Sequence, residues 1–378
     1  MARAYTPGLK VSARTRHRAE RLLPIGGTVT VAAGDKVEAR QVVARTLIPG
    51  DITPLNMASL LGVPPADVPE CMLKKVGDRI GEGEILARTK GMFGFFQSER
   101  LSPVGGTIEV VSSVTGQVLI RGEPLPLELE AYLAGTVVEV IDGEGCIVEA
   151  DASLVQGIFG IGGEAHGNLR LATRRAGEPL DADAIHPDMR GAVIVGGARV
   201  TGEAIVKARE VGVSALVVGG IDDADLERLL GYDLGVAITG SEDVGLTLVV
   251  TEGFGDIAMA ERTFSLFGLR EGAEASVNGA TQIRAGVLRP EVVMPFTDRD
   301  GELPPMPPPG GEPHALDAGM PVRIVREPYF GLIGSVGALP HEPQVLESGA
   351  RARVVEVKLD SGGNVIIPRA NVELIESG

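Results

Sequence analysis

A pattern that occurs twice near the amino terminus limits the folds open to this part of the chain. Residues 34–46 read GDKVEARQVVART, and residues 77–89 read GDRIGEGEILART. Each copy begins with a Gly-Asp turn and continues into a short segment whose apolar residues stand at alternate or nearly alternate positions, as in a β-strand. Duplicated units of this kind predict a β-barrel or β-sandwich built from repeated hairpins.

The residues around the second copy carry a resemblance to a known fold. Residues 76–87 resemble the first half of a biotinyl/lipoyl-type barrel-sandwich hybrid, and residues 102–118 resemble its second half. A smaller Gly-Thr-apolar repeat, at residues 26–29, 105–108 and 134–137, extends the likeness over about residues 24–150. The resemblance implies a duplicated, lipoyl-like barrel-sandwich hybrid in this domain.

Carriers of that family present a modified lysine on the hairpin between the two halves. In this chain the hairpin tip falls near Phe93, and the nearest lysine, Lys90, lies about one turn early without the neighbours that such carriers use. We therefore expect no cofactor, neither biotin nor lipoate. The tip instead gathers Phe93, Phe95 and Phe96, which would form either a plug of the barrel or an exposed binding patch.

Length and charge narrow the class of protein. A chain of 378 residues predicts two to four domains. Its net charge of −16 argues against broad nucleic-acid binding and against binding to anionic membranes. The two cysteines, Cys71 and Cys146, are too few for a disulfide framework or a zinc site. Without an apolar stretch long enough to span a membrane or to serve as a secretory signal, we expect a cytoplasmic protein.

Residues 1–23 form a basic amino-terminal arm. They contain six lysine and arginine residues against one acidic residue, Glu20. Such a segment is interpreted as a solvated, partly disordered arm, or alternatively as one that touches RNA or an acidic partner.

Residues 190–298 change to the pattern of an α/β domain. Apolar strand-like segments at residues 191–196, 213–218, 236–239 and 246–250 alternate with helical patterns at residues 202–211, from Asp222 onward, and at residues 257–267. This alternation predicts a small three-layer α/β domain with a mostly parallel sheet, and residues 285–295 predict one more strand. Residues 151–189, which contain a weak G-x-G-x-x-A match at residues 160–165, are interpreted as a connecting segment.

A proline-rich linker at residues 299–319 precedes a last domain at residues 320–378. Residues 319–334 resemble a KOW motif of NusG-type transcription factors and ribosomal proteins, which implies an SH3-like barrel with contact residues at Tyr329 and Phe330. The remaining strands of such a barrel would lie at residues 354–359, 364–368 and 371–375. On residues 258–264 and 278–286, the chain is also similar to an uncharacterised bacterial family that combines these three parts.

Catalytic and metal-binding motifs are not recognisable in the sequence, so candidate chemistry rests on the loops that follow the α/β strands. Ligands of open α/β sheets bind at the carboxyl ends of the strands. Glycine-rich loops at residues 196–197, 219–223, 239–242 and 251–255 could cradle a phosphate or a carboxylate, or could simply end strands and cap helices. The expected ligand-binding residues are Asp222, Glu252, Asn278, Gln282 and Arg284.

Two functions from different classes fit these observations. The favoured one is a non-catalytic interaction or scaffold protein whose barrel and KOW-like modules dock on macromolecules, such as the transcription or translation machinery. A protein partner is expected, and RNA contact through the basic arm or the KOW-like module is a further option. The alternative is an enzyme or sensor for a phosphate- or carboxylate-containing small molecule, centred on the α/β domain. The sequence leaves the oligomeric state open.

Overall fold

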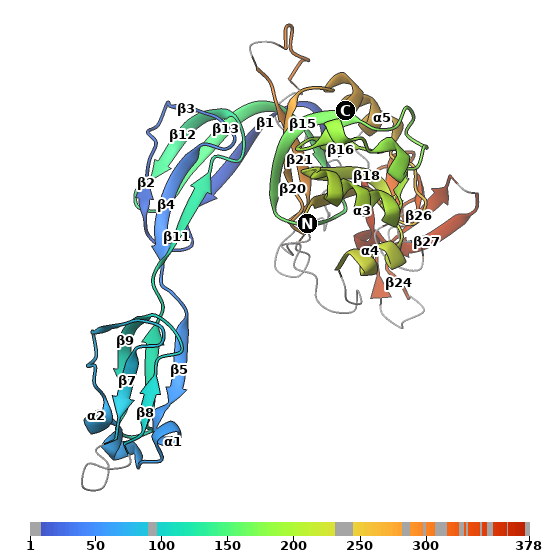
Figure 1. Ribbon diagram of the computed structural model, residues 1–378. Helices are drawn as coiled ribbons and strands as arrows, with labels where there is room; N and C mark the ends of the chain where they lie inside the picture. Colours follow the sequence, from blue (N-terminus) through green and yellow to red (C-terminus); the bar gives the residue numbers. More distant parts are fainter. Residues whose placement is uncertain are drawn as a thin grey trace.

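The computed structural model describes residues 9–89, 97–230, 245–281, 288–297, 300–306, 316–324, 329, 332–340, 342–345, 351–360 and 362–374. The fold is mainly β, with several sheets and one region of alternating strands and helices, as predicted. An elongated arm of two β modules extends from a body that contains the α/β domain and a C-terminal β module (Figure 1). Among the described helices, none combines the length and apolar character needed to cross a membrane.

The two arm modules are nested in the sequence. The proximal module contains β2 (Thr28–Val29), β3 (Lys36–Val37), β4 (Val42–Ile48), β11 (Leu125–Glu130), β12 (Gly135–Ile141) and the adjoining parts of β1 (Val11–Leu22) and β13 (Gly145–Gln156). The distal module is inserted between β4 and β11. It contains β5 (Ile52–Asn56), α1 (Met57–Leu61), the 3-10 helix η1 (Pro65–Asp67), α2 (Val68–Cys71), β6 (Arg79–Ile80), β7 (Ile85–Arg88), β8 (Glu99–Leu101), β9 (Gly106–Val111) and β10 (Gln117–Arg121).

The sequence repeat corresponds to one turn that is built twice. Gly34 and Gly77 adopt φ of 94° and 93°, a left-handed conformation that favours glycine. The following carboxylates, Asp35 and Asp78, each accept a hydrogen bond from the backbone N–H three residues earlier, at 2.8 and 2.7 Å. The N–H groups of Gly34 and Gly77 donate to the equivalent strands β12 and β9, at 2.7 and 2.8 Å. The predicted duplication is therefore confirmed as a local structure.

Strand pairing extends the equivalence beyond the turn. Val37 of β3 pairs with Gly135 of β12, and Ile80 of β6 pairs with Gly106 of β9. Likewise β4 pairs with β11 in the proximal module, and β7 pairs with β8 in the distal one. Residues 89–98 connect β7 directly to β8 in the distal module. In the proximal module, the whole distal module stands at the equivalent place, between β4 and β11.

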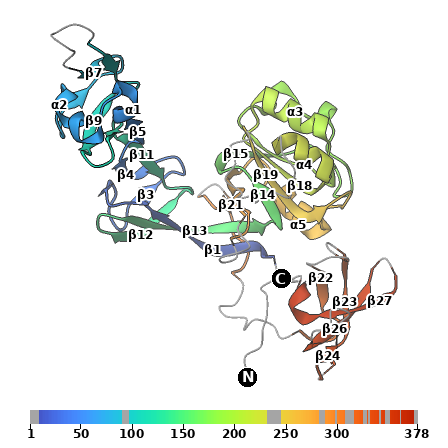
Figure 2. The same cartoon turned by 90° about the horizontal axis from the view of Figure 1, so that it is seen from below.

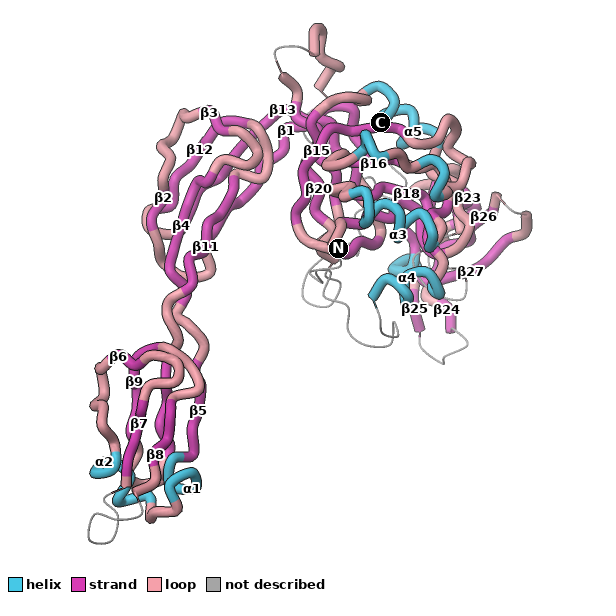
Figure 3. Tube along the Cα trace, viewed as in Figure 1, coloured by secondary structure: helices cyan, strands magenta, loops and turns pink. Residues whose placement is uncertain are grey.

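A narrow neck joins the two modules. Residues 49–51 and 122–124 run between them as two loop segments (Figure 3). Gly122 N–H donates to the Asp51 carbonyl at 2.9 Å, and a Cβ at Gly50 would lie 2.4 Å from the Gly122 carbonyl oxygen. The close approach of the two segments requires glycine at this crossing.

Removal of the distal module tests this nested organisation. Because residues 51 and 122 are hydrogen-bonded neighbours, an Asn-Gly turn in place of residues 51–121 can close the proximal hairpin. The distal module has its own core, separate from the core of the proximal module, so we expect the shortened chain to fold with its melting temperature within a few degrees of the intact protein. Circular dichroism measures this, and a loss of cooperative unfolding would contradict it.

The long strands β1 and β13 form the ribbon that connects the arm to the body. The first half of β13 pairs with β12, its second half pairs with β21 (Glu291–Pro295), and β1 runs antiparallel along its other side. The prediction of a partly disordered basic arm is therefore wrong for residues 11–22. Two of its arginines, Arg16 and Arg18, stand directly opposite Asp151 and Glu149, so the positive charges form a cross-strand ladder of ion pairs.

This ladder predicts a dependence of stability on pH. A hydrogen bond from Arg14 holds the pKa of Asp151 below its usual range. Since the folded pKa is depressed, the carboxylate stabilises the fold above the unfolded pKa and loses this effect as the pH falls through the folded value. We expect Asp151→Asn to lower the melting temperature more at pH 7 than at pH 2.5. An equal difference at both pH values would contradict a role for the charge.

The α/β domain has three layers. Its sheet contains β14 (Phe159–Ile161), β15 (Glu164–Leu171), β16 (Val193–Val195), β17 (Arg199–Val200), β18 (Ala215–Ile221), β19 (Thr247–Phe254) and β20 (Glu274–Asn278). The strands β15, β16, β18 and β19 are mutually parallel. One face packs against α3 (Gly202–Val211) and α4 (Asp223–Leu230), and the other packs against α5 (Glu261–Leu269).

The structure corrects one prediction in this domain and confirms another. The interpretation of residues 151–189 as a connecting segment is wrong, because β14 and β15 lie within it and β15 is paired on both sides. The predicted helix at residues 202–211 is confirmed. The Thr201 side chain accepts from the Ala204 N–H at its start, and Gly212 ends it in a left-handed conformation. The predicted strand at residues 236–239 lies outside the described residues.

The C-terminal module is a five-stranded antiparallel sheet in the order β27-β26-β23-β22-β28. Its elements are β22 (Pro321–Ile324), β23 (Ile333–Ala338), β26 (Val354–Leu359), β27 (Asn364–Pro368), the 3-10 helix η4 (Arg369–Asn371) and β28 (Val372–Leu374), with a small hairpin of β24 (Gln344–Val345) and β25 (Arg351–Ala352). The predicted strands at residues 354–359 and 364–368 are confirmed. The module lies beside the α/β domain (Figure 2).

Candidate functional site

The described candidate residues each have their own partners within the protein. Asp222 and Glu252 stand at the carboxyl ends of the neighbouring parallel strands β18 and β19, and Asn278 ends β20. Among the described residues, no hydrogen bond or ion pair joins one of these three side chains to another. The other candidates, Gln282, Arg284, Phe93, Phe95, Phe96 and Phe330, lie outside the described residues.

Two of the glycine-rich loops, at residues 196–197 and 219–220, pack closely against backbone atoms of other segments. A Cβ at Gly197 would lie 2.1 Å from the Arg175 carbonyl oxygen, and a Cβ at Gly219 would lie 2.5 Å from that of Ile257. Met259 N–H donates to the Gly197 carbonyl at 2.8 Å. These glycines therefore permit close packing of chain segments, which favours the second of the two interpretations of residues 196–197 and 219–220.

Asp222 makes an ion pair at the same edge. It accepts a hydrogen bond from Arg199 of β17, and this bond raises the pKa of the Arg199 guanidinium. Both side chains are partly exposed. Asp222 thus has a structural partner from the neighbouring strand.

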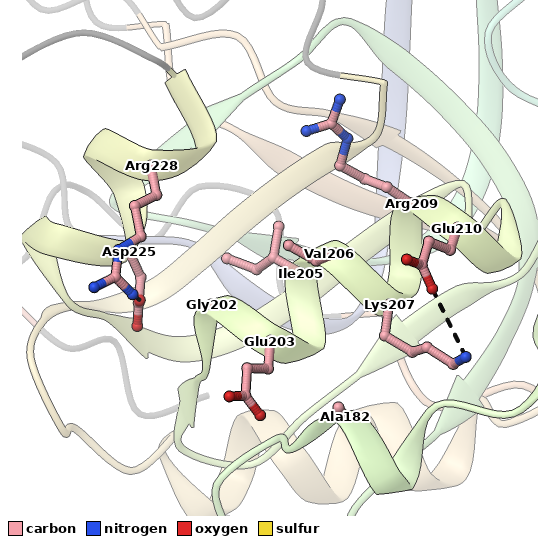
Figure 4. A pocket seen from close by; sticks show the side chains of 10 residues that line it. All are labelled: Ala182, Gly202, Glu203, Ile205, Val206, Lys207, Arg209, Glu210, Asp225 and Arg228. Atoms are coloured by element: carbon pink, nitrogen blue, oxygen red, sulfur yellow. Dashed lines mark hydrogen bonds and ion pairs between the residues drawn. The ribbon is translucent and has the colours of Figure 1, made fainter.

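A shallow groove of about 370 Å³ lies nearby on the outer surface of α3 and α4 (Figure 4). Its charged side chains pair with one another, Lys207 with Glu210 at 3.8 Å and Arg228 with Asp225 at 3.3 Å. None of the described ligand-binding candidates lines it. The groove is an open surface feature rather than a pocket at the ends of the strands.

Glu252 is held entirely by protein groups. One carboxylate oxygen accepts from the Ala260 N–H, at 3.1 Å, where α5 begins. The other oxygen accepts from Arg323 of the C-terminal module, whose second terminal nitrogen donates to the Thr251 carbonyl at 3.3 Å. Glu252 and Arg323 are both almost fully buried. The candidate ligand residue therefore binds a guanidinium supplied by the same chain.

A second buried ion pair lies beside the first. Arg289, just before β21, donates to Glu373 of β28. Glu373 stands directly opposite Arg323 in the pairing of β22 with β28. Burial raises the pKa of Glu373, and the charges of Arg289 and Arg323 offset only part of this rise. We name Glu252, Arg323, Glu373 and Arg289 the charge quartet.

A different polar cluster fixes the arm to the body. Arg21 of β1 makes a two-pronged ion pair with Glu164 of β15, at 2.6 and 2.8 Å, and its Nε donates to the Glu130 carbonyl at 2.7 Å. Its guanidinium lies over the ring of Tyr132, which is buried and is the one described residue other than glycine with positive φ, 71°. These contacts join the proximal module to β15 of the α/β domain, and we name them the joint cluster.

Asn278 lies next to this cluster in a row of paired residues. It stands between Glu164 of β15 and Glu291 of β21, and Glu291 approaches His17 and the Tyr132 hydroxyl, each at 3.4 Å. The Asn278 side chain itself accepts from the Ala280 N–H at 2.9 Å and so holds the turn that follows β20. Asn278, an expected ligand-binding residue, therefore stabilises a hydrogen-bonded turn.

Tyr329, an expected contact residue of the KOW-like motif, is half-buried and packs against the core of the C-terminal module. Sequence reasoning missed the quartet because its partners come from distant segments. The one local signal is a charge in the middle of an apolar triplet, Val322-Arg323-Ile324 and Val372-Glu373-Leu374.

Scans of the sequence against protein-family models and against curated protein sequences found no match.

Proposed function

We propose that this protein is a non-catalytic interaction or scaffold protein. Its arm would consist of two cofactor-free, lipoyl-like barrel-sandwich hybrids, and its C-terminal module would be a KOW-like SH3-like barrel. The arm would carry a docking surface for a protein partner at its far end. The observation that carries this proposal is the nested pair of modules, which holds the distal module away from the body (Figure 1).

The far end of the distal module exposes apolar side chains. Leu60, Leu101 and Val114 are 43%, 57% and 85% exposed. They belong to one end of the module, because Arg100 donates to the Leu60 carbonyl and the turn at residues 112–116 packs against α1. Thr89 and Ser98, which flank the segment containing Phe93, Phe95 and Phe96, are bonded at 2.9 Å at the end of β7 and β8. Exposed apolar side chains gathered at one end favour contact with another protein.

The strand order of the C-terminal module supports the KOW-like assignment. Numbered along the main sheet, the strands follow the order 5-1-2-3-4, and the 3-10 helix η4 joins the last two. This order is the arrangement expected of an SH3-like barrel. The acidic net charge of −16 favours a protein partner over direct RNA contact.

Capture from a lysate with three chains tests the proposal: the intact protein, the chain lacking residues 51–121, and a variant with Phe93, Phe95 and Phe96 all changed to serine. We expect a partner that binds the intact chain and is lost from both variants. The variant Val206→Ser is a matched control, because Val206 is an exposed apolar residue of the body, far from the arm in the sequence. Partners retained equally by all chains would contradict an arm-borne surface.

The alternative, a small-molecule enzyme or sensor, is favoured only by the groove on α3 and α4. Ligands that bind the folded state raise its melting temperature. A saturable rise with a nucleotide, sugar phosphate or carboxylic acid that is lost in Asp225→Ala would support the alternative and count against the interaction proposal.

A further inference from the structure

The charge quartet lies on a face that the C-terminal module does not need for its own folding. In β22, Val322 and Ile324 point into the module's core while Arg323 points away from it, and Glu373 occupies the equivalent outward position in β28. Such outward positions are normally solvated in an antiparallel sheet. Here Arg323 and Glu373 are 5% and 1% exposed, because the α/β domain covers them.

The α/β domain offers the complementary pattern of charges. Its strand β14 pairs with β19 only as far as Val250. The Thr251 carbonyl lies beyond this pairing and accepts a hydrogen bond from Arg323. Glu252 then meets Arg323, and Arg289 meets Glu373. Each surface carries one positive and one negative charge, so only one orientation of the module pairs both, and like charges would oppose the reverse orientation.

Buried charges of this kind hold two surfaces in register at little net gain in stability. Each one gives up its hydration, and the pairing roughly offsets that loss. Among the described residues, Arg323 Nε and Glu373 Oε2 are buried without a hydrogen-bond partner, which raises the free energy of the docked state further. On separation all four charges regain water, while the segment between β21 and β22, which includes Pro307-Pro308-Pro309, keeps the module tethered.

We propose that the C-terminal module is a releasable cap on the α/β domain, held in one orientation by the charge quartet. When docked, it covers the Glu252 end of β19 and hides its own β22–β28 face. When released, it exposes both surfaces to partners while remaining attached. This inference goes beyond the proposed function and does not depend on an arm-borne surface.

Charge reversal in the full chain tests the cap. Arg323→Glu places like charges against Glu252, and Glu252→Arg does the same from the other side, so each single variant should release the module. Two readouts report release: the radius of gyration from small-angle X-ray scattering, and the rate of cleavage by a glutamate-specific protease after Glu373, which is 1% exposed when the module is docked. We expect a larger radius and cleavage at least about tenfold faster in each single variant.

The double variant Glu252→Arg/Arg323→Glu restores opposite charges across the interface with exchanged positions. It should bring both readouts part of the way back to those of the original protein, because position 323 then carries the same charge as Glu373 opposite it. Arg351→Glu, an exposed charge change in the same module, is the control and should change neither. Circular dichroism verifies that each variant is folded. Unchanged scattering and cleavage in the folded single variants would overturn the proposal, as would a folded double variant that stays released.

Discussion

Replacing Gly197 by alanine is expected to lower the free energy of unfolding of the α/β domain by about 3 kcal/mol. The added Cβ would lie 2.1 Å from the Arg175 carbonyl oxygen and 2.8 Å from that of Glu178. Both obstacles are backbone atoms, so relief requires the segment at residues 175–178 to shift. That shift would also disturb the contact of Met259 N–H with the Gly197 carbonyl. Urea-induced unfolding followed by circular dichroism measures the loss.

Gly163→Ala is the matched control. A Cβ at Gly163 meets nothing within 4 Å, and its φ is not in the left-handed region, so alanine there should be neutral or slightly stabilising. If Gly197→Ala were as harmless as Gly163→Ala, the edge would have room for an added group. The description of these loops as closed by backbone packing would then be wrong.

Arg21→Met should cost about 2–4 kcal/mol of stability, because it removes the two-pronged ion pair and leaves Glu164 without its cation. Methionine keeps much of the volume of the arginine side chain, so the loss reports the charge and the hydrogen bonds rather than a cavity. The same change should loosen the joint between arm and body. Thermal unfolding measures the first effect, and small-angle scattering measures the second.

Arg18→Met, in the same strand, compares an exposed arginine with the buried Arg21. The Arg18 side chain is 64% exposed and pairs with Glu149 at 2.7 Å on the outer face of the ribbon. Exposed pairs contribute little, so we expect a change within about 0.5 kcal/mol. Equal losses for Arg18→Met and Arg21→Met would contradict the idea that the joint cluster, rather than the ladder, fixes the arm.

Elements with strong local signals could be predicted from the sequence. The turn at Gly34 and Gly77 was visible because only glycine suits a left-handed position before an aspartate that closes the turn. The strand at residues 364–368 follows Gly362-Gly363, and the helix at residues 202–211 has a threonine cap and a terminal glycine. In each case the residues at the end of a strand or helix indicate where that element begins or stops.

Elements that depend on distant partners could not be predicted. The strand Glu164–Leu171 has a glycine and four polar or charged residues, and it forms because β16 and β20 supply hydrogen bonds on both sides. The basic residues of β1 looked solvated until Glu149 and Asp151 were placed opposite them. Glu252 was correctly expected near the carboxyl end of a strand, but its partner, Arg323, lies 71 residues away in another module.

The affinity of a captured, purified partner for two chains, the intact protein and the one lacking residues 51–121, tests the central claim most directly. If the distal module carries the docking surface, isothermal titration should show binding to the intact chain and at least a hundredfold weaker binding to the shortened one, about 2.7 kcal/mol. Equal affinities for two well-folded chains would contradict the account and would move the interaction surface to the body.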